Sequence, residues 1–288
     1  MTATVTGPAV RGGGGRPVRF AAARDIAVVT RRNLRRIRRT PRLLAASSIQ
    51  PILFVLLFRY VFGGSIHVPG VSYVDYLLPG IFITTTLFGA TTAVAMAADL
   101  TGGMIDRFRS FPMARSAVLV GRCIADLVRT VLVVALVLAV GTLIGFRFHN
   151  GVLPALAAIG LVLAFSFAFM WLYALVGMLV KDPETAQQAA FVPLFPYIFA
   201  SSVFVPVQNM PGWLQAFARN QPVSVTVYAV RSLSEGGPIA HYAWQSGAWI
   251  VGFVVPTSLE IWLSLNSGWL LISHAMASGL SWRLAIGV

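Results

Sequence analysis

One segment constrains the fold of this chain more than any other: residues 153–180 are almost entirely apolar and carry no charged side chain. A helix needs about 20 mostly apolar residues to cross the hydrocarbon core of a bilayer, and this segment is long enough. Hydrophobic residues make up 57% of the chain and charged residues 11%, whereas soluble domains average about 45–50% and about 25%. The composition excludes an ordinary soluble enzyme and a disordered chain, and it predicts an all-α integral membrane protein.

Other apolar segments predict a polytopic protein with about six transmembrane helices. The expected membrane domain covers residues 43–263, with spans at 43–62, 77–98, 117–146, 153–180, 190–207 and 242–263. The segment 264–288 is also apolar, but Asn266 and His274 dilute it. Whether this C-terminal segment forms a seventh span, an interfacial helix or a tail stays open.

The distribution of basic residues predicts the orientation of the chain in the cytoplasmic membrane. Half of the 22 lysine and arginine residues lie in residues 1–42, and cytoplasmic loops carry the excess of basic residues in membrane proteins. We therefore expect 1–42, 99–116 and 181–189 to be cytoplasmic, and 64–74 and 208–238 to be external. Because the basic residues are not spread over a folded surface, a nucleic-acid partner is not expected.

The N-terminal arm divides into two parts. Residues 1–19 contain a run of glycines and are expected to be disordered. Residues 20–42 have the pattern of a basic amphipathic helix, with Arg31, Arg35 and Arg38 away from its apolar positions. Such a helix suits the headgroup layer of anionic lipid. The alternative is a positive cluster that only orients the chain.

The chain lacks the motifs of ATP and metal chemistry. Its only lysine, Lys181, is not preceded by glycine or followed by Ser or Thr, so a Walker A loop is excluded. The 4 histidines and the single cysteine, Cys123, show no metal-binding spacing. We expect no enzyme activity, no catalytic residue, no metal and no cofactor in this chain, with ATP and Mg²⁺ bound by a separate ATPase.

A proton-driven carrier needs ionisable residues in its spans, and the best candidates are Arg122, Asp126 and Arg129. They share one helical face, so the carboxylate can pair with either arginine. They form either a buried relay or, as we favour, paired charges in the interfacial turns of the third span.

The loop between the second and third spans combines arginines and aromatics between helix breakers. Exposed aromatics and arginines are common anchors of protein interfaces, which predicts a contact with the ATPase. The alternative is that the two phenylalanines dip into lipid. The predicted coupling residues are Asp106, Arg107, Phe108, Arg109, Phe111 and Pro112.

These motifs resemble the type-2 ABC exporter permeases, and within them the daunorubicin-resistance permease subfamily. The resemblance is carried by Asp75–Gly80, Asp99–Pro112, Gly121-Arg122, Met210–Gln215, Asn220–Pro222 and Ala229–Leu233. It implies six spans, an amphipathic N-terminal helix, a cytoplasmic coupling helix and a permease dimer bound to two separate ATPase subunits. It also implies that Gln208–Gly237 forms short external or re-entrant helices, with Trp213, Phe217 and Pro222 closing the pathway. A plain surface loop is the alternative.

Taken together, these features predict the permease subunit of an ATP-driven exporter that works by alternating access. The expected partners are two copies of an ABC-type ATPase, a second identical or homologous permease, and membrane lipids. The expected cargo is a hydrophobic or amphipathic drug or antibiotic, because the expected lining offers aromatics and hydroxyls without a charge cluster. A lipid or glycolipid exporter, a non-transporting scaffold and a proton-driven carrier are the alternatives.

Overall fold

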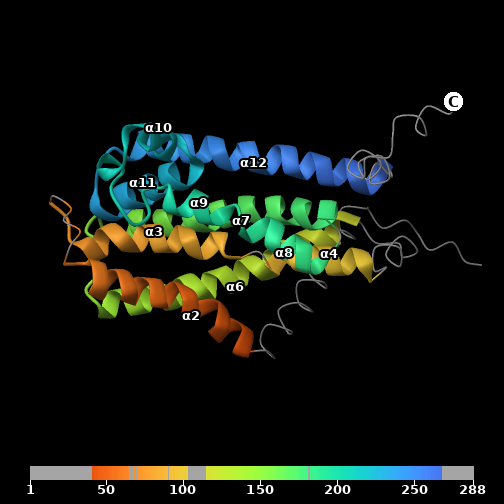
Figure 1. The fold of residues 1–288 in the computed structure, drawn as a ribbon, viewed down its shortest axis with the longest axis horizontal. Helices are drawn as coiled ribbons and strands as arrows, with labels where there is room; N and C mark the ends of the chain where they lie inside the picture. The colour runs from red at the N-terminus through yellow and green to blue at the C-terminus, as the bar shows by residue number, and fades with distance from the viewer. Residues whose placement is uncertain are drawn as a thin grey trace, which may run out of the picture.

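The computed structural model describes residues 41–64, 66, 68, 70–89, 91–102, 115–180 and 182–267, and every regular element in these ranges is helical (Figure 1). In chain order these elements are α2 (Pro41–Leu57), the π-helix η1 (Phe58–Phe62), α3 (Tyr73–Leu87), α4 (Thr91–Thr101), α6 (Arg115–Leu143), α7 (Val152–Val180), α8 (Pro183–Phe191), α9 (Leu194–Phe199), the 3₁₀-helix η2 (Val207–Asn209), α10 (Gly212–Asn220), α11 (Pro222–Glu235) and α12 (Ile239–Ser267). This confirms the predicted all-α class. The segment 1–40, with the expected disordered start and most of the expected amphipathic helix, lies outside the described residues, as does 268–288.

In the described part of the chain, 4 helices are long and apolar enough to cross a membrane: Tyr73–Thr101, Cys123–Leu143, Val152–Val180 and Ile239–Leu263. They fall on the second, third, fourth and sixth predicted spans, and the long helices run side by side (Figure 1). The first predicted span contains a shorter apolar helix, Ser47–Phe62. The total of six spans stays a prediction.

The segment 190–207, predicted as the fifth span, is not one continuous helix, and its crossing of the membrane stays a prediction. α8 ends at Phe191, α9 is only 6 residues long, and no helix covers residues 200–206. Pro193 and Pro196 explain the interruption, because proline lacks the N–H that continues a helix and its ring clashes with the preceding turn. The segment still extends along the bundle. α8, before it, packs on α4, and the Phe204 carbonyl, near its end, accepts a hydrogen bond from Tyr73 at the start of α3.

The second predicted span is broken between α3 and α4. Thr84, Thr85 and Thr86 each donate a side-chain hydrogen bond to the carbonyl three residues before, with donor–acceptor distances of 2.7–2.9 Å. Such bonds compete with the helical ladder and bend helices. At the break, the Tyr173 hydroxyl of α7 donates to the Leu87 carbonyl. The Tyr173 hydroxyl therefore satisfies a carbonyl that a continuous helix would pair with a backbone N–H, and the threonine bonds are additional to the ladder of α3.

α3 lies at the centre of the packing, with α2, α6, α7 and α11 against it. All of its residues except Thr85 are buried. Gly80 allows the closest approach, because a Cβ at that position would lie 2.6 Å from the Val203 carbonyl oxygen. Small residues let backbones approach in membrane helices in this way. We call the end of the bundle where α3 begins the Tyr73 end, and the opposite end, where α4 finishes, the Thr101 end.

Candidate functional site

The predicted site residues fall in three places. The coupling residues Asp106 to Pro112 and the basic residues Arg31, Arg35 and Arg38 lie outside the described residues, so their roles stay predictions. The predicted gate residues are described. Trp213 and Phe217 are on α10, where their side chains are 78% and 48% exposed, whereas Pro222 is buried at the start of α11. The structure therefore does not bring these three residues together in one cluster.

The segment that holds the gate residues is folded into the bundle. α10 and α11 are two short helices, and α11 packs against α3, α7 and α12 near the Tyr73 end (Figure 1). Most of α11 is buried, including its hydroxyl residues Ser224 and Thr226. We call residues 200–235 the α10–α11 unit. It contains short helices, as the resemblance implied, and is not a plain surface loop.

Arg231 of α11 joins the irregular backbone after α9 to α3. Its guanidinium donates through Nε to the Tyr76 carbonyl at 2.8 Å, and through Nη2 to the carbonyls of Ser202 and Val203 at 2.7 and 3.1 Å. It also lies over the Tyr76 ring, 3.5 Å from the centroid. Its side chain is buried among these groups. No sequence pattern indicates this role, because a count of charges carries no information on burial.

Other side chains complete the support of the irregular backbone after α9. The Tyr76 hydroxyl donates to the Ser202 carbonyl at 3.0 Å, and Ser224 Oγ accepts from the Ser202 N–H at 2.9 Å. Gln221 donates to the Ala200 carbonyl at 2.5 Å. Irregular backbone at membrane depth survives only where protein or water satisfies its polar groups. These bonds provide that satisfaction.

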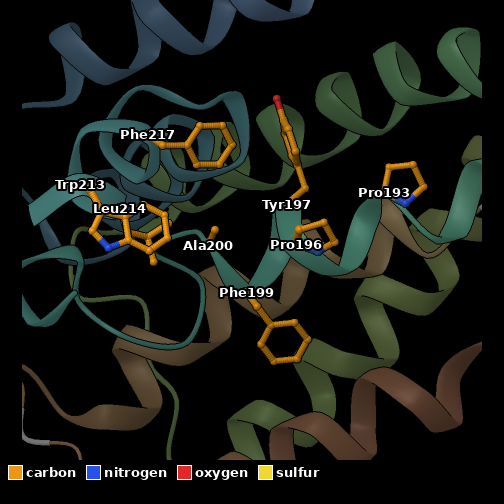
Figure 2. A pocket seen from close by; sticks show the side chains of 8 residues that line it. All are labelled: Pro193, Pro196, Tyr197, Phe199, Ala200, Trp213, Leu214 and Phe217. Atoms are coloured by element: carbon orange, nitrogen blue, oxygen red, sulfur yellow. The ribbon is translucent and has the colours of Figure 1, made fainter. Parts of the chain in front are cut away.

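An aromatic groove lies between α9 and α10 (Figure 2). Its volume is about 880 Å³, and it is lined by Pro193, Pro196, Tyr197, Phe199, Ala200, Trp213, Leu214 and Phe217. Figure 2 shows the Phe199 and Tyr197 rings pointing in opposite directions from α9, with Trp213 and Leu214 on the α10 side. No lining residue carries a charge. The groove can therefore take an apolar group, and the Tyr197 hydroxyl and the Trp213 indole N–H are the side-chain polar groups of its lining.

A row of aromatic rings in contact continues from this groove to α2. Phe199 lies 5.5 Å from Phe204, and Phe204 stacks on Phe58 at 4.2 Å with an interplanar angle of 6°. Phe54, which lines a second surface pocket on α2, is 5.9 Å from Phe204. We call the exposed and half-buried rings Phe54, Phe58, Phe199, Trp213 and Phe217, together with the buried Phe204 that links them, the aromatic face. Stacked and tilted rings at these separations attract one another.

A cluster of three titratable groups lies at the Tyr73 end. One ligand atom each from Asp75, His149 and Glu235 lies within 4.8 Å of the others. His149 Nδ1 is 3.0 Å from Glu235 Oε2. Burial raises the pKa of the Glu235 carboxyl, and the Asp75 carboxylate adds to this while His149 opposes it. No sequence spacing could have revealed this cluster, because its members come from α3, the α6–α7 connection and α11.

The charges considered for a relay lie between α4 and α6. Thr92 donates to Asp126 Oδ2 at 2.7 Å, Arg129 donates to Thr91 at 2.7 Å, and Arg129 Nε is 3.9 Å from Asp126 Oδ1. Both charged residues stand in the first turns of the apolar helix Cys123–Leu143. The side chains therefore attach the start of α4 to α6.

The apolar helices, together with an irregular unit held inside the bundle by side-chain hydrogen bonds, define a multi-pass integral membrane protein of the transporter class. The chain belongs to the ABC-2 type transporter family, which matches residues 24–234. The family supplies transmembrane permease subunits, so ATP is hydrolysed by a separate subunit and not by this chain.

Among curated proteins, the chain is similar to the daunorubicin resistance ABC transporter permease protein DrrB1 of Streptomyces coeruleorubidus. The two are 30% identical over 246 residues, which cover 85% of this chain and 84% of the relative. The chain is also similar to the probable doxorubicin resistance ABC transporter permease protein DrrC of Mycobacterium tuberculosis. These two are 28% identical over 221 residues, which cover 74% of this chain and 78% of the relative. The resemblance seen in the sequence is confirmed.

Proposed function

We propose that this chain is the membrane subunit of an exporter that moves hydrophobic or amphipathic, drug-like compounds out of the cell by alternating access. It works as a dimer of permeases with two copies of an ABC-type ATPase, which bind ATP and Mg²⁺. The two relatives described above carry daunorubicin and doxorubicin resistance in their names. The basic N-terminal arm supports a cytoplasmic N-terminus, which places the Tyr73 end outside.

The observation that carries this proposal is the aromatic face. Large aromatic side chains on the surface of a helical bundle are expected against lipid, a second protomer or an apolar cargo. Here neighbouring rings contact one another from Phe58 through the buried Phe204 to Phe199, and Phe199 borders a groove of about 880 Å³, which is the size range of small-molecule sites. A row of rings without charges favours a cargo that itself has flat apolar surfaces. A lipid or glycolipid, with flexible acyl chains, fits this row less well.

Coupling to the ATPase uses the segment that follows α4. We assign the contact to Asp106, Arg107, Phe108, Arg109, Phe111 and Pro112, with the two phenylalanines as anchors, because interface anchors are enriched in aromatics and arginine. Arg31, Arg35 and Arg38 are assigned to anionic lipid headgroups.

The test is transport by the permease and its ATPase in vesicles, with the fluorescence of entrapped daunorubicin as the readout. Phe199→Ala and Trp213→Ala should each reduce ATP-dependent transport several-fold while the ATPase stays bound. Trp244→Ala is the matched control, since Trp244 is 74% exposed on α12 and borders no part of the aromatic face. Unchanged transport in both groove variants would contradict the assignment of the groove to cargo.

A further inference from the structure

Three segments that are distant in the chain bring metal-ligand side chains together at the Tyr73 end. Asp75 lies in the first turn of α3, His149 in the connection between α6 and α7, and Glu235 at the end of α11. Their ligand atoms all lie within 4.8 Å of one another. Asp75 is buried, Glu235 is 17% exposed and His149 is 52% exposed, so the cluster is reached from solvent only on the histidine side.

The cluster holds two carboxylates without a matching fixed cation. Of the described residues, only His149 forms an ion pair with either carboxylate. The guanidinium of Arg147 donates instead to the carbonyls of Thr142 and Phe146. Arg231, one turn before Glu235, is held by backbone carbonyls as described above. Two neighbouring carboxylates repel each other unless a cation or a proton lies between them.

A second observation points to a missing ligand. The Oε1 atom of Glu235 is shielded from solvent and accepts no hydrogen bond among the described residues. A buried carboxylate oxygen without a donor is unfavourable, because it loses its hydration and gains nothing in exchange. A bound cation would supply the missing interaction.

The chemistry of the ligands selects the type of cation. One imidazole nitrogen with two carboxylate oxygens is a ligand set that Zn²⁺ accepts, with solvent at a fourth position. Ca²⁺ prefers six to eight oxygens and no imidazole. Bonds of about 2.0–2.2 Å require ligand atoms about 3.3 Å apart. His149 Nδ1 and Glu235 Oε2, at 3.0 Å, are already this close, and the Asp75 oxygen, within 4.8 Å of both, has to approach them.

The ligands are held by neighbouring groups, as in known metal sites. Asp75 accepts from the Ser72 hydroxyl at 2.6 Å and from the Arg147 N–H at 3.1 Å. The backbone N–H of His149 donates to the Ser234 carbonyl at 2.9 Å, which fixes the connection beside Glu235. Such outer contacts orient ligands and raise metal affinity.

We propose that Asp75, His149 and Glu235 form a binding site for a divalent transition-metal ion of the Zn²⁺ type. The ion joins α11 to α3 and to the α6–α7 connection. This site is separate from the aromatic face and does not depend on the proposed cargo.

The test uses the full chain in lipid nanodiscs after removal of metals with a chelator. Zn²⁺ alone is titrated by calorimetry, and bound zinc is counted by mass spectrometry. We expect one Zn²⁺ per chain and a higher thermal unfolding temperature with Zn²⁺ than without it, and no such effect of Ca²⁺. His149→Gln and Glu235→Gln should each weaken binding at least about tenfold, since even loss of an outer contact typically weakens metal binding about 10–100-fold.

His241→Gln and Glu184→Gln are the matched controls, because both residues are exposed and lie outside the cluster. They should bind Zn²⁺ like the wild type. His149 is half exposed on a connection, so His149→Gln should fold even if Glu235→Gln does not. Co²⁺ provides a second readout: its visible absorption should show a tetrahedral site in the wild type and lose intensity in His149→Gln. The proposal is overturned if the wild type binds no stoichiometric Zn²⁺, or if His149→Gln binds it as tightly as the controls.

Discussion

Arg231→Met is expected to loosen the α10–α11 unit, both within itself and against α3. The guanidinium donates to three carbonyls, those of Tyr76, Ser202 and Val203. After the substitution the Ser202 carbonyl keeps the Tyr76 hydroxyl as a donor. The Val203 carbonyl lies in non-helical backbone and loses the guanidinium. Methionine has a similar length but no donor, so it fills the space without replacing these bonds.

The size of the effect follows from the lost bonds. A hydrogen bond from a charged donor contributes about 1.5–3 kcal/mol, and a buried acceptor left without a donor costs about 1–3 kcal/mol. Relief from burying the charge offsets part of this loss. We therefore expect a net loss of about 2–4 kcal/mol, which raises the population in which the unit is detached by about 30-fold or more. The stability of Arg231→Lys should lie between those of the wild type and Arg231→Met, because an ammonium cannot reach all three carbonyls in the same geometry.

Two measurements check this expectation in lipid nanodiscs: the thermal unfolding temperature, and the rate of trypsin cleavage at Arg219, which is exposed on α10. Arg219→Met is the control for stability, since that side chain bonds only to Gln215 of its own helix and should change stability by less than about 0.5 kcal/mol. If Arg231→Met unfolds at the wild-type temperature and is cleaved no faster, the guanidinium does not hold the unit in place, and our reasoning on the carbonyls fails.

Four further predictions follow from other parts of the chain. Gly80→Ala should destabilise the protein by about 1–3 kcal/mol, because the new Cβ meets the Val203 carbonyl at 2.6 Å, whereas Gly160→Ala, with open space around it, should not; thermal unfolding compares them. Phe111→Ala should weaken binding of the ATPase by about tenfold or more in a copurification titration, and equal binding would favour the lipid-dipping alternative. In a Cys123→Ser background, an impermeant thiol reagent should label a cysteine at position 213 from outside cells and one at position 108 only from inside; the reverse result would invert the topology. Hydrogen bonds from Thr185 lower the pKa of Asp182, the N-cap of α8, so its stabilisation is present above the ordinary carboxyl pKa and is lost as pH falls through the lowered value. The protection factors of the α8 amides, corrected for the pH dependence of intrinsic exchange, should therefore fall in acid, whereas those of the control Asp182→Ala should be low and show no such fall.

The sequence predicted those parts of the fold that depend on continuous hydropathy. The segment 153–180 and the helix α7 (Val152–Val180) coincide almost completely, because a long uncharged run has only one stable arrangement in lipid. The segment predicted as the fifth span is not one continuous helix, for a local reason. Hydropathy averaged over 190–207 ignores that Pro193 and Pro196 interrupt the backbone ladder.

The candidate sites show a second limit. The positions of Trp213 and Phe217 in short helices followed from the resemblance, but their exposure beside α9 depends on packing that no local pattern records. Arg231 was counted as a loop charge, since its carbonyl partners belong to Tyr76 and to residues that are not adjacent in sequence. Asp75, His149 and Glu235 meet only through the tertiary fold.

The break between α3 and α4 has a mechanical consequence. α3 is fixed by close packing on several sides, whereas α4 is a separate 11-residue rod that leads at Thr101 toward the predicted coupling residues. At the joint, threonine hydroxyls and the Tyr173 hydroxyl bind the carbonyls, and these bonds tolerate a change of angle better than a straight ladder does. A rod of this length is about 16 Å long, so tilting it by about 10° moves its far end by about 3 Å. Because α4 packs on α7 and α8, a displacement at the Thr101 end is passed to these two helices, while the break after Leu87 separates it from α3.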